Sequence, residues 1–451
     1  MQTIIISTLF IIFLERERER ERVDKLPAAI RMDSDSDNDP SGDDSSASTA
    51  TLMIEEWWRD TLQMIGENDP QQKQLILIGN PNHAQDITDE EWEELGRDIS
   101  NNTHLNRLDL CHGALNNNRM SCLFRGLTRS SCIKELGFYD NEFSLAGVQK
   151  MVPFLQGANS LTRLDLNGNN IQSEGFNLLF RALSDSPIEE LRCSRNRIET
   201  LEIDIEHIPE HLKHLYLSIN NISVDGCRGL AKLLQGNVNM ESLHLDYNDI
   251  DDEGVAILVD ALQSNTTLEG LDLQENVDIS NQGKMKLLKL VSDISSITAT
   301  LQSNHTLTYI IVECNEHDQF QDHIDNATDI NSETDSPEAA GRQKVIETQL
   351  DSKRRAELAE LQGVNQSLYS EIDPLHLPEV LALVGRRHGK GELYVALKAS
   401  IAGVISTVNR KECIRQQMAY HKKQMAQHAE KLKELGTELA AIEAAEGTSS
   451  E

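Results

Sequence analysis

The chain has 451 residues, and its 42 Lys and Arg against 74 Asp and Glu give a formal net charge of −32. This acidic excess argues against a nucleic-acid binder or a binder of anionic membranes, because both kinds of partner require basic protein surface. The 7 cysteines form no CxxC pair, which argues against a disulfide scaffold. A reducing compartment is therefore expected, namely the cytoplasm or also the nucleus.

The N-terminal segment 1–51 is predicted to be disordered and acidic. It begins with an apolar run, Ile4 to Leu14, that is shorter than the roughly 18 residues needed to span a bilayer. No basic residue precedes this run, which argues against a secretory signal, while a signal anchor stays open as the alternative. Met32 opens a Ser- and Asp-rich stretch typical of a disordered terminus, so residues 1–31 are interpreted as an extension that need not be native.

Residues 52–71 carry apolar side chains at near-helical spacing, namely Leu52, Ile54, Trp57, Trp58, Leu62 and Ile65. This spacing predicts an amphipathic helix. We expect it to cap the repeat array that follows it and to shield the first apolar rung from water.

The segment 72–318 repeats the frame LxxLxLxxN. Leu161–Asn169 reads LTRLDLNGN, and eight to nine such copies start at residues 72, 105, 133, 161, 188, 212, 240, 268 and 307. Positions 4 and 6 of a copy face one side of a short strand, and the Asn at position 9 can satisfy backbone groups at the turn. Helical spacing of Leu and Ala follows most copies. Each unit therefore reads as strand, turn and helix, and only a stacked array buries the apolar faces.

This pattern resembles leucine-rich repeat proteins of the ribonuclease-inhibitor-like class, which includes ribonuclease inhibitor, the repeats of NOD-like receptors and Ran GTPase-activating proteins. The resemblance covers residues 72–318 and has a period of about 28 residues. It implies an α/β horseshoe, with a parallel sheet on the concave face and helices on the convex face.

Two copies depart from the common length. The copy that starts at 188 is short and lacks the Gly-plus-helix half, which predicts an extended or irregular convex segment. The copy that starts at 268 is long, and its extra residues indicate either a longer helix or a functional protrusion.

Side chains at positions 3, 5, 7 and 8 of each copy are expected on or beside the concave face. The candidate protein-binding residues among them are Arg107, Asp109, Tyr139, Arg163, Asp165, Glu190, Arg192, Tyr216, His244, Asp246, Tyr247, Asp272 and Tyr309. Tyr combines a large rigid contact area with a polar tip and is enriched at binding hot spots. Acidic residues outnumber arginines at these positions, so we expect a protein partner with a basic patch. The alternative is that these residues bind no partner and simply form the polar, solvent-exposed side of the sheet.

The sequence shows no catalytic motif, so we expect no enzyme, no cofactor and no metal site. His244 and Asp246 lie two residues apart, but no Walker loop, HExxH or nucleophile elbow accompanies them. The alternative function is Ran-type small-GTPase binding or GTPase activation. The family's arginine would fall within 87–92, which contains none, and Arg97 and Arg119 lie out of register.

Three segments complete the chain. Residues 319–342 are polar and acidic and are predicted to form a flexible linker, and residues 343–410 are predicted to be helical. Residues 411–445 step by 4 and 3 through apolar positions, which predicts a coiled coil, although His421 and His428 weaken its seam. Homodimerisation through this segment and packing on the preceding helices both stay open. Together these features predict a non-catalytic scaffold for protein recognition.

Overall fold

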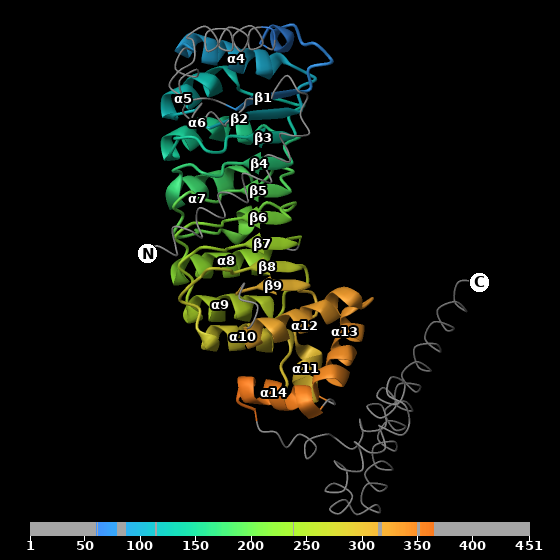
Figure 1. Ribbon diagram of the computed structural model, residues 1–451. Helices are drawn as coiled ribbons and strands as arrows, with labels where there is room; N and C mark the ends of the chain where they lie inside the picture. Colours follow the sequence, from blue (N-terminus) through green and yellow to red (C-terminus); the bar gives the residue numbers. More distant parts are fainter. Residues whose placement is uncertain are drawn as a thin grey trace, which may run out of the picture. The chain divides into compact units, whose positions relative to one another are not determined.

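The computed structural model describes residues 60, 62–78, 87–112, 115–237, 239–313, 318–349 and 352–364. Nine strands in this part of the chain form one parallel sheet in strict chain order (Figure 1). They are β1 (Gln74–Ile78), β2 (Arg107–Cys111), β3 (Glu135–Gly137), β4 (Arg163–Asp165), β5 (Glu190–Arg192), β6 (His214–Tyr216), β7 (Ser242–His244), β8 (Gly270–Asp272) and β9 (Tyr309–Ile311). One strand comes from each predicted copy, which confirms the repeat register.

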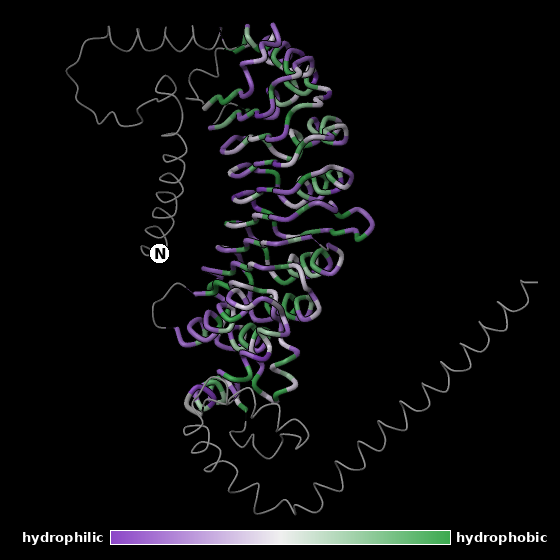
Figure 2. Tube along the Cα trace, turned by 90° about the vertical axis from the view of Figure 1, so that its right-hand side faces the viewer, coloured by the Kyte–Doolittle hydropathy of each residue, from purple (hydrophilic) through white to green (hydrophobic). Residues whose placement is uncertain are grey.

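Helices lie along one side of this sheet (Figure 1). They are α4 (Asp89–Asn101), α5 (Asn117–Gly126), α6 (Leu145–Leu155), α7 (Gln172–Ala182), α8 (Val224–Gly236), α9 (Asp252–Leu262) and α10 (Asn281–Val291). Figure 2 shows the stacked coils from the side, with hydrophobic and hydrophilic residues alternating along each coil. The fold is therefore the predicted α/β solenoid.

A ladder of leucines forms the core between sheet and helices. Leu108 pairs in register with Leu136, and Leu164 pairs with Leu191, in the middle of each strand. These side chains are at most 1% exposed, as are most of the aliphatic residues two positions further on. Each rung rests on its neighbours, so the array rather than any single copy is the stable unit.

The asparagine at position 9 bonds the backbone of neighbouring coils in the six copies that start at residues 133 to 268. Asn220 donates from Nδ2 to the carbonyls of Leu217 (2.9 Å) and Cys193 (3.1 Å). Its Oδ1 accepts the backbone N–H of Asn196 at 2.9 Å and that of Ile198 at 3.0 Å. The predicted role of this asparagine is confirmed.

The residue before this asparagine adopts a left-handed backbone. Seven successive copies place a positive φ at position 8, at His112, Asp140, Gly168, Arg195, Ile219, Tyr247 and Glu275. Only Gly168 is the residue type that favours this region, and a β-branched residue such as Ile219 is strained there. The turn therefore ends each strand at a fixed point and aims the position 7 and 8 side chains at the rim of the sheet.

The convex side is irregular where the sequence predicted it. After β5 the described chain forms no α-helix before β6, only the 3-10 helix η2 (Ile205–His207). Gly229 of α8 packs directly on this segment, because an added Cβ would lie 2.1 Å from the carbonyl oxygen of Leu201. The long copy forms neither one longer helix nor a lone protrusion. Its extra residues form a second helix, α11 (Ile297–Gln302), which contacts the C-terminal helices.

The predicted flexible linker over 319–342 is wrong, because the structure forms helices there. The C-terminal elements are α12 (Gln319–Glu333), α13 (Pro337–Lys344), the π-helical turn η3 (Val345–Gln349) and α14 (Ser352–Gln362). Four apolar residues at helical spacing form the buried face of α12 despite its acidic composition: Phe320, Ile324, Ala327 and Ile330. The overall composition of the segment is polar, so this narrow apolar stripe was not recognised as the buried face of a helix.

These C-terminal helices cap the last strand. Gln321 makes hydrogen bonds like those of the position 9 asparagines: its Nε2 donates to the carbonyl of Ile310 (2.7 Å), and its Oε1 accepts the N–H of Val312 (2.9 Å). Lys344 is fully buried and donates from Nζ to the carbonyl of Val291 at 2.7 Å, at the end of α10. Burial lowers the pKa of Lys344 to about 7.

Three sequence predictions fall partly or wholly outside the described residues. Of the predicted capping helix 52–71, residues 62–66 are helical, and Ile65 is buried. The N-terminal segment 1–51 and the predicted coiled coil 411–445 lie outside the described part. The helical prediction for 343–410 is described only to residue 364, and it is helical there to Gln362.

Candidate protein-binding surface

Strand positions 3 and 5 carry half-buried polar side chains along the face opposite the helices. The structure places ten of the thirteen predicted residues on the strands themselves, namely Arg107, Asp109, Arg163, Asp165, Glu190, Arg192, Tyr216, His244, Asp272 and Tyr309. Tyr139 lies two residues after the end of β3, and Asp246 and Tyr247 lie two and three residues after the end of β7. The register therefore brings the ten strand residues to one face. This face divides into two parts of different chemistry.

The first part, here called the ion-pair half, comprises the position 3 and 5 residues of β2 to β5. Arg107 lies 2.7 Å from the Asp109 carboxylate and 3.7 Å from that of Glu135 on the next strand. Arg163 lies 3.8 Å from Glu190 and 4.0 Å from Asp165. Arginine and acid thus alternate along and across the strands.

Burial and charge compete for the carboxylates of this half. Burial raises the pKa of Asp165 above its ordinary range, although Arg192 and Arg163 oppose the shift. Burial also favours a higher pKa for Glu190, but Arg192 and Arg163 together hold that pKa below its usual value. Most of the negative charge in this half is therefore balanced within the protein itself.

A stack of three side chains joins the two halves. The guanidinium carbon of Arg192 lies 4.5 Å from the centroid of the Tyr216 ring, a cation–π contact between β5 and β6. The other neighbour of Tyr216 is His244 on β7, whose ring is stacked at 4.4 Å with planes 7° apart. The stack fixes both rings on the concave face.

The second part, here called the aromatic–acidic half, comprises Tyr216, His244, Asp246, Asp272 and Tyr309. Burial first, and the nearby Asp272 carboxylate second, raise the pKa of Asp246 to about 6. Ser218 donates a hydrogen bond from Oγ to the Asp246 carboxylate and partly opposes this shift. Asp272 lies 3.8 Å from His244. Two carboxylates therefore crowd together in this half.

Tyr309 occupies the end of the aromatic–acidic half. Its ring crosses the strand position of Gly270, where an added Cβ would lie 1.9 Å from a ring carbon. Glycine is required at this position because the ring occupies the space of any side chain. Tyr309 is 36% exposed and is among the large hydrophobic side chains that the described residues leave accessible.

The structure shows how the predicted residues pair with one another, which the sequence did not indicate. Three predicted acids, Asp109, Asp165 and Glu190, are ion-paired with arginines of the same face. The sequence places His244 two residues from Asp246 in the same copy, whereas its proximity to Asp272 depends on the neighbouring strand. Asp272 sits one copy further along at position 5, and one ligand atom of each of the three side chains lies within 4.8 Å of the others. A comparison of the same repeat position in adjacent copies could have revealed this cluster, because residues at that position become neighbours in the sheet.

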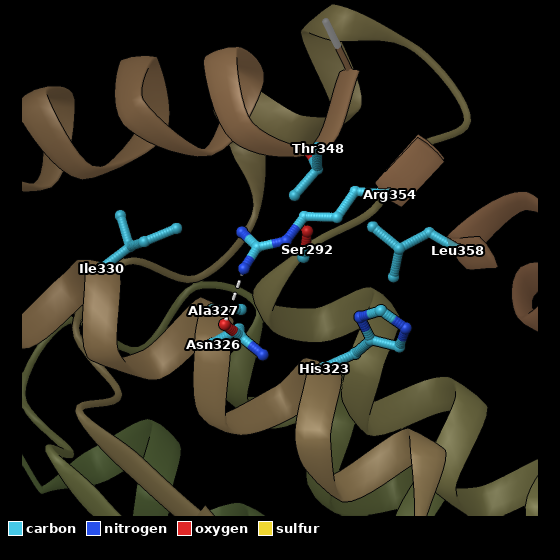
Figure 3. A pocket seen from close by; sticks show the side chains of 8 residues that line it. All are labelled: Ser292, His323, Asn326, Ala327, Ile330, Thr348, Arg354 and Leu358. Atoms are coloured by element: carbon cyan, nitrogen blue, oxygen red, sulfur yellow. Dashed lines mark hydrogen bonds between the residues drawn. The ribbon is translucent and has the colours of Figure 1, made fainter. Parts of the chain in front are cut away.

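A shallow pocket lies in the C-terminal cap (Figure 3). It is lined by Ser292, His323, Asn326, Ala327, Ile330, Thr348, Arg354 and Leu358. Arg354 extends across it and donates to the Asn326 side chain at 3.0 Å, as the dashed line shows. Burial lowers the pKa of His323 at its edge. Because Arg354 spans the space and no predicted site residue lines it, we assign it to packing within the cap.

Residues 87–92, where the arginine of Ran GTPase-activating proteins would fall, contain the N-terminus of α4. Thr88 caps α4, and its side chain and that of Glu91 exchange hydrogen bonds with each other's backbone N–H. Arg97 is ion-paired with Glu93 at 2.8 Å within the same helix. This placement on α4, away from the strands, lends no support to the small-GTPase alternative.

Comparison with known proteins supplies the family. A family model described as Leucine Rich repeat matches residues 157–176, 209–231 and 236–258, which cover parts of the coils around β4, β6 and β7. The protein is a leucine-rich repeat protein. Its coils of about 28 residues with full convex helices are of the ribonuclease-inhibitor-like type. A sequence comparison with curated proteins found no match.

Several solved structures are similar to parts of this leucine-rich repeat protein. Leiomodin-1 actin-binding site 2 shares 17% identity over 30% of this chain and 76% of that chain, with a TM-score of 0.27. A chain of the yeast Rad7–Elc1 complex shares 11% identity over 60% and 87%, with a TM-score of 0.32. A chain of the mouse RP105/MD-1 complex shares 16% over 40% and 35%, with a TM-score of 0.23. At these TM-scores the assignment rests on the family match and the repeat geometry.

Among the described helices, none is both long enough and apolar enough to cross a bilayer.

Proposed function

We propose that this leucine-rich repeat protein is a non-catalytic scaffold that binds a protein partner through its concave face. The leucine-rich repeat fold itself suggests protein–protein interaction. The observation that carries the proposal is the aromatic–acidic half, where Tyr216 and His244 are held in a stack beside Asp246 and Asp272. Rigid aromatic rings lose little entropy on binding, so they are effective anchors for a partner.

The charge of this half favours a partner with a basic patch. Asp246 and Asp272 place two carboxylates close together, and the Asp272 charge contributes to the raised pKa of Asp246, so a nearby positive charge would be attracted to this point. In the ion-pair half, by contrast, Arg107 and Arg163 already balance the neighbouring acids. We therefore place the main contact on β6 to β9.

The experiment that tests this proposal maps the partner onto the face. A photo-cross-linking amino acid is placed at position 309 in the full chain, with a matched control at position 135 in the ion-pair half. Both side chains are accessible, since Tyr309 is 36% and the Glu135 side chain 42% exposed. Affinity purification and mass spectrometry should yield cross-links to a Lys- or Arg-rich segment from position 309. Cross-links from position 135 alone would contradict the proposal.

Self-association is a separate proposal that rests on the sequence of residues 411–445. Two histidines at seam positions, His421 and His428, should gain charge below about pH 6.5 and loosen a coiled coil. Sedimentation equilibrium of the full chain at pH 7.5 and pH 5.5 should show a dimer that dissociates at the lower pH. A constant monomer mass at both values would remove this proposal.

A further inference from the structure

Three side chains with metal-binding atoms converge on the concave face at strands β7 and β8. His244 ends β7, Asp246 follows it by two residues, and Asp272 ends β8. One ligand atom from each lies within 4.8 Å of the other two. The Nδ1 atom of His244 lies 3.8 Å from Oδ2 of Asp272. The register of adjacent copies creates this cluster, because His244 and Asp272 are paired residues of the sheet.

Each of the three side chains is oriented by a further contact. Tyr216 stacks on the His244 ring at 4.4 Å and leaves the ring edge, which carries both nitrogens, pointing away from the stack. Ser218 donates to Oδ1 of Asp246, and the N–H of Gln274 donates to Oδ1 of Asp272 at 3.0 Å. The other oxygen of Asp272, Oδ2, is the one that faces His244. Contacts of this kind fix the geometry of metal ligands in proteins.

Electrostatics also favours a cation at this point. Asp246 and Asp272 bring two carboxylates to the same point of the face. A divalent cation between them would balance their charge, since two ionised carboxylates together carry −2. A neutral imidazole completes a donor set of one nitrogen and two oxygens.

We propose that His244, Asp246 and Asp272 form a binding site for a divalent transition-metal ion, with Zn²⁺ as the ion that the donor set fits best. Zinc accepts imidazole nitrogen and carboxylate oxygen at about 2.0–2.2 Å and is held by three protein ligands where a further position is open. In the tetrahedral geometry of zinc, ligand atoms about 2.1 Å from the ion lie about 3.4 Å apart. The ligand atoms of this cluster, which lie within 4.8 Å of one another, therefore need to approach by up to about 1.4 Å through χ rotations of the three side chains. Metal binding at this site needs no protein partner, and a basic partner would compete with the ion for the same two carboxylates.

The experiment measures metal binding by the chelator-treated full chain. Isothermal titration with ZnCl₂ is done on the native sequence and on three near-isosteric variants, His244→Gln, Asp246→Asn and Asp272→Asn. The matched control is His214→Gln on β6, a histidine of the same face that lies 3.8 Å from Glu241. The native chain and the control should bind one Zn²⁺ with equal affinity, and each of the three variants should bind at least tenfold more weakly.

Two further readouts keep the result decisive. Circular dichroism and thermal melting show whether each variant is folded, and Zn²⁺ should raise the melting temperature of the native chain but not of Asp272→Asn. X-ray absorption of the Zn-loaded native chain needs no variant and should show only nitrogen and oxygen ligands. No saturable binding, unchanged affinity in the folded aspartate variants, or sulfur ligands from the cysteines would overturn the proposal.

Discussion

The two halves of the concave face use the same strand positions for opposite purposes. In the ion-pair half, arginine and acid alternate from Arg107 to Glu190, so the face neutralises itself. In the aromatic–acidic half, Tyr216, His244, Asp272 and Tyr309 occupy positions 3 and 5, and Asp246 at position 7 lies close to Asp272. The repeat therefore dictates where side chains point, while residue identity decides which part is internally satisfied and which part is suited to a ligand.

The largest expected difference between the halves is in partner binding. Tyr216→Ala combined with Tyr247→Ala removes one ring of the aromatic–acidic half and the ring that follows Asp246 in the chain. This pair should weaken partner affinity by about 30-fold or more, since hot-spot residues contribute about 2 kcal/mol or more. Arg107→Ala with Glu135→Ala in the ion-pair half should change the affinity less than about threefold. Surface plasmon resonance with the cross-linked partner measures both. Equal losses from the two pairs would show that the whole face binds.

A second difference concerns stability and pH. The pKa of Asp246 is raised from 3.8 to about 6, so the folded state holds its proton more tightly than the unfolded state. The contribution of Asp246 to the free energy of unfolding is fully present below about pH 4 and is lost as the pH rises through about 6. Asp246→Asn should therefore stabilise the protein at pH 7 by about 1–3 kcal/mol, and by nearly nothing at pH 4. Urea unfolding with chelator present tests this, and a destabilised variant at pH 7 would refute the crowding of carboxylates.

Replacing an arginine of the ion-pair half should destabilise the protein, in contrast to Asp246→Asn. Arg163→Met removes the guanidinium between Glu190 and Asp165, and leaves two partly buried carboxylates with less compensating charge. We expect a loss of about 1–2 kcal/mol at pH 7, discounted for partial exposure. The same urea unfolding experiment measures it. A neutral effect would mean that Arg192 alone balances both acids.

The smallest expected effect lies in the turns that end the strands. Position 8 is left-handed in both halves, with Gly168 in one and Ile219 in the other. Ile219→Asn should stabilise by about 0.5–1 kcal/mol, because Asn tolerates this backbone region better than a β-branched residue. Gly168→Ala should have the opposite sign, since its Cβ would lie 2.1 Å from Oδ1 of Asp140. Thermal melting of both variants decides the point, and a less stable Ile219→Asn protein would contradict it.

Much of the fold follows from the repeat, because a fixed period places every strand and its inward leucines. The positions of Tyr216, His244 and Asp272 on one face follow from the same period. The pairing of Arg163 with Glu190 could not be predicted, since it depends on side-chain rotamers across two strands. The α12 helix was missed because its acidic residues outweighed a narrow apolar stripe.

The cluster around Asp246 was missed for a different reason. Its three members come from positions 5 and 7 of one copy and position 5 of the next, so they become neighbours only once the register of β7 and β8 is known. Within a single copy, His244 and Asp246 are only a pair of polar residues on a strand. Comparing equal positions across copies recovers such neighbours in a repeat protein.

A matched charge reversal tests most directly the claim that the partner binds the aromatic–acidic half. Asp272→Lys on β8 and Glu135→Lys on β3 each change the charge by two units at a strand position of the concave face. The account predicts that Asp272→Lys weakens the measured partner affinity at least tenfold more than Glu135→Lys does. Equal effects, or a larger effect from Glu135→Lys, would contradict it.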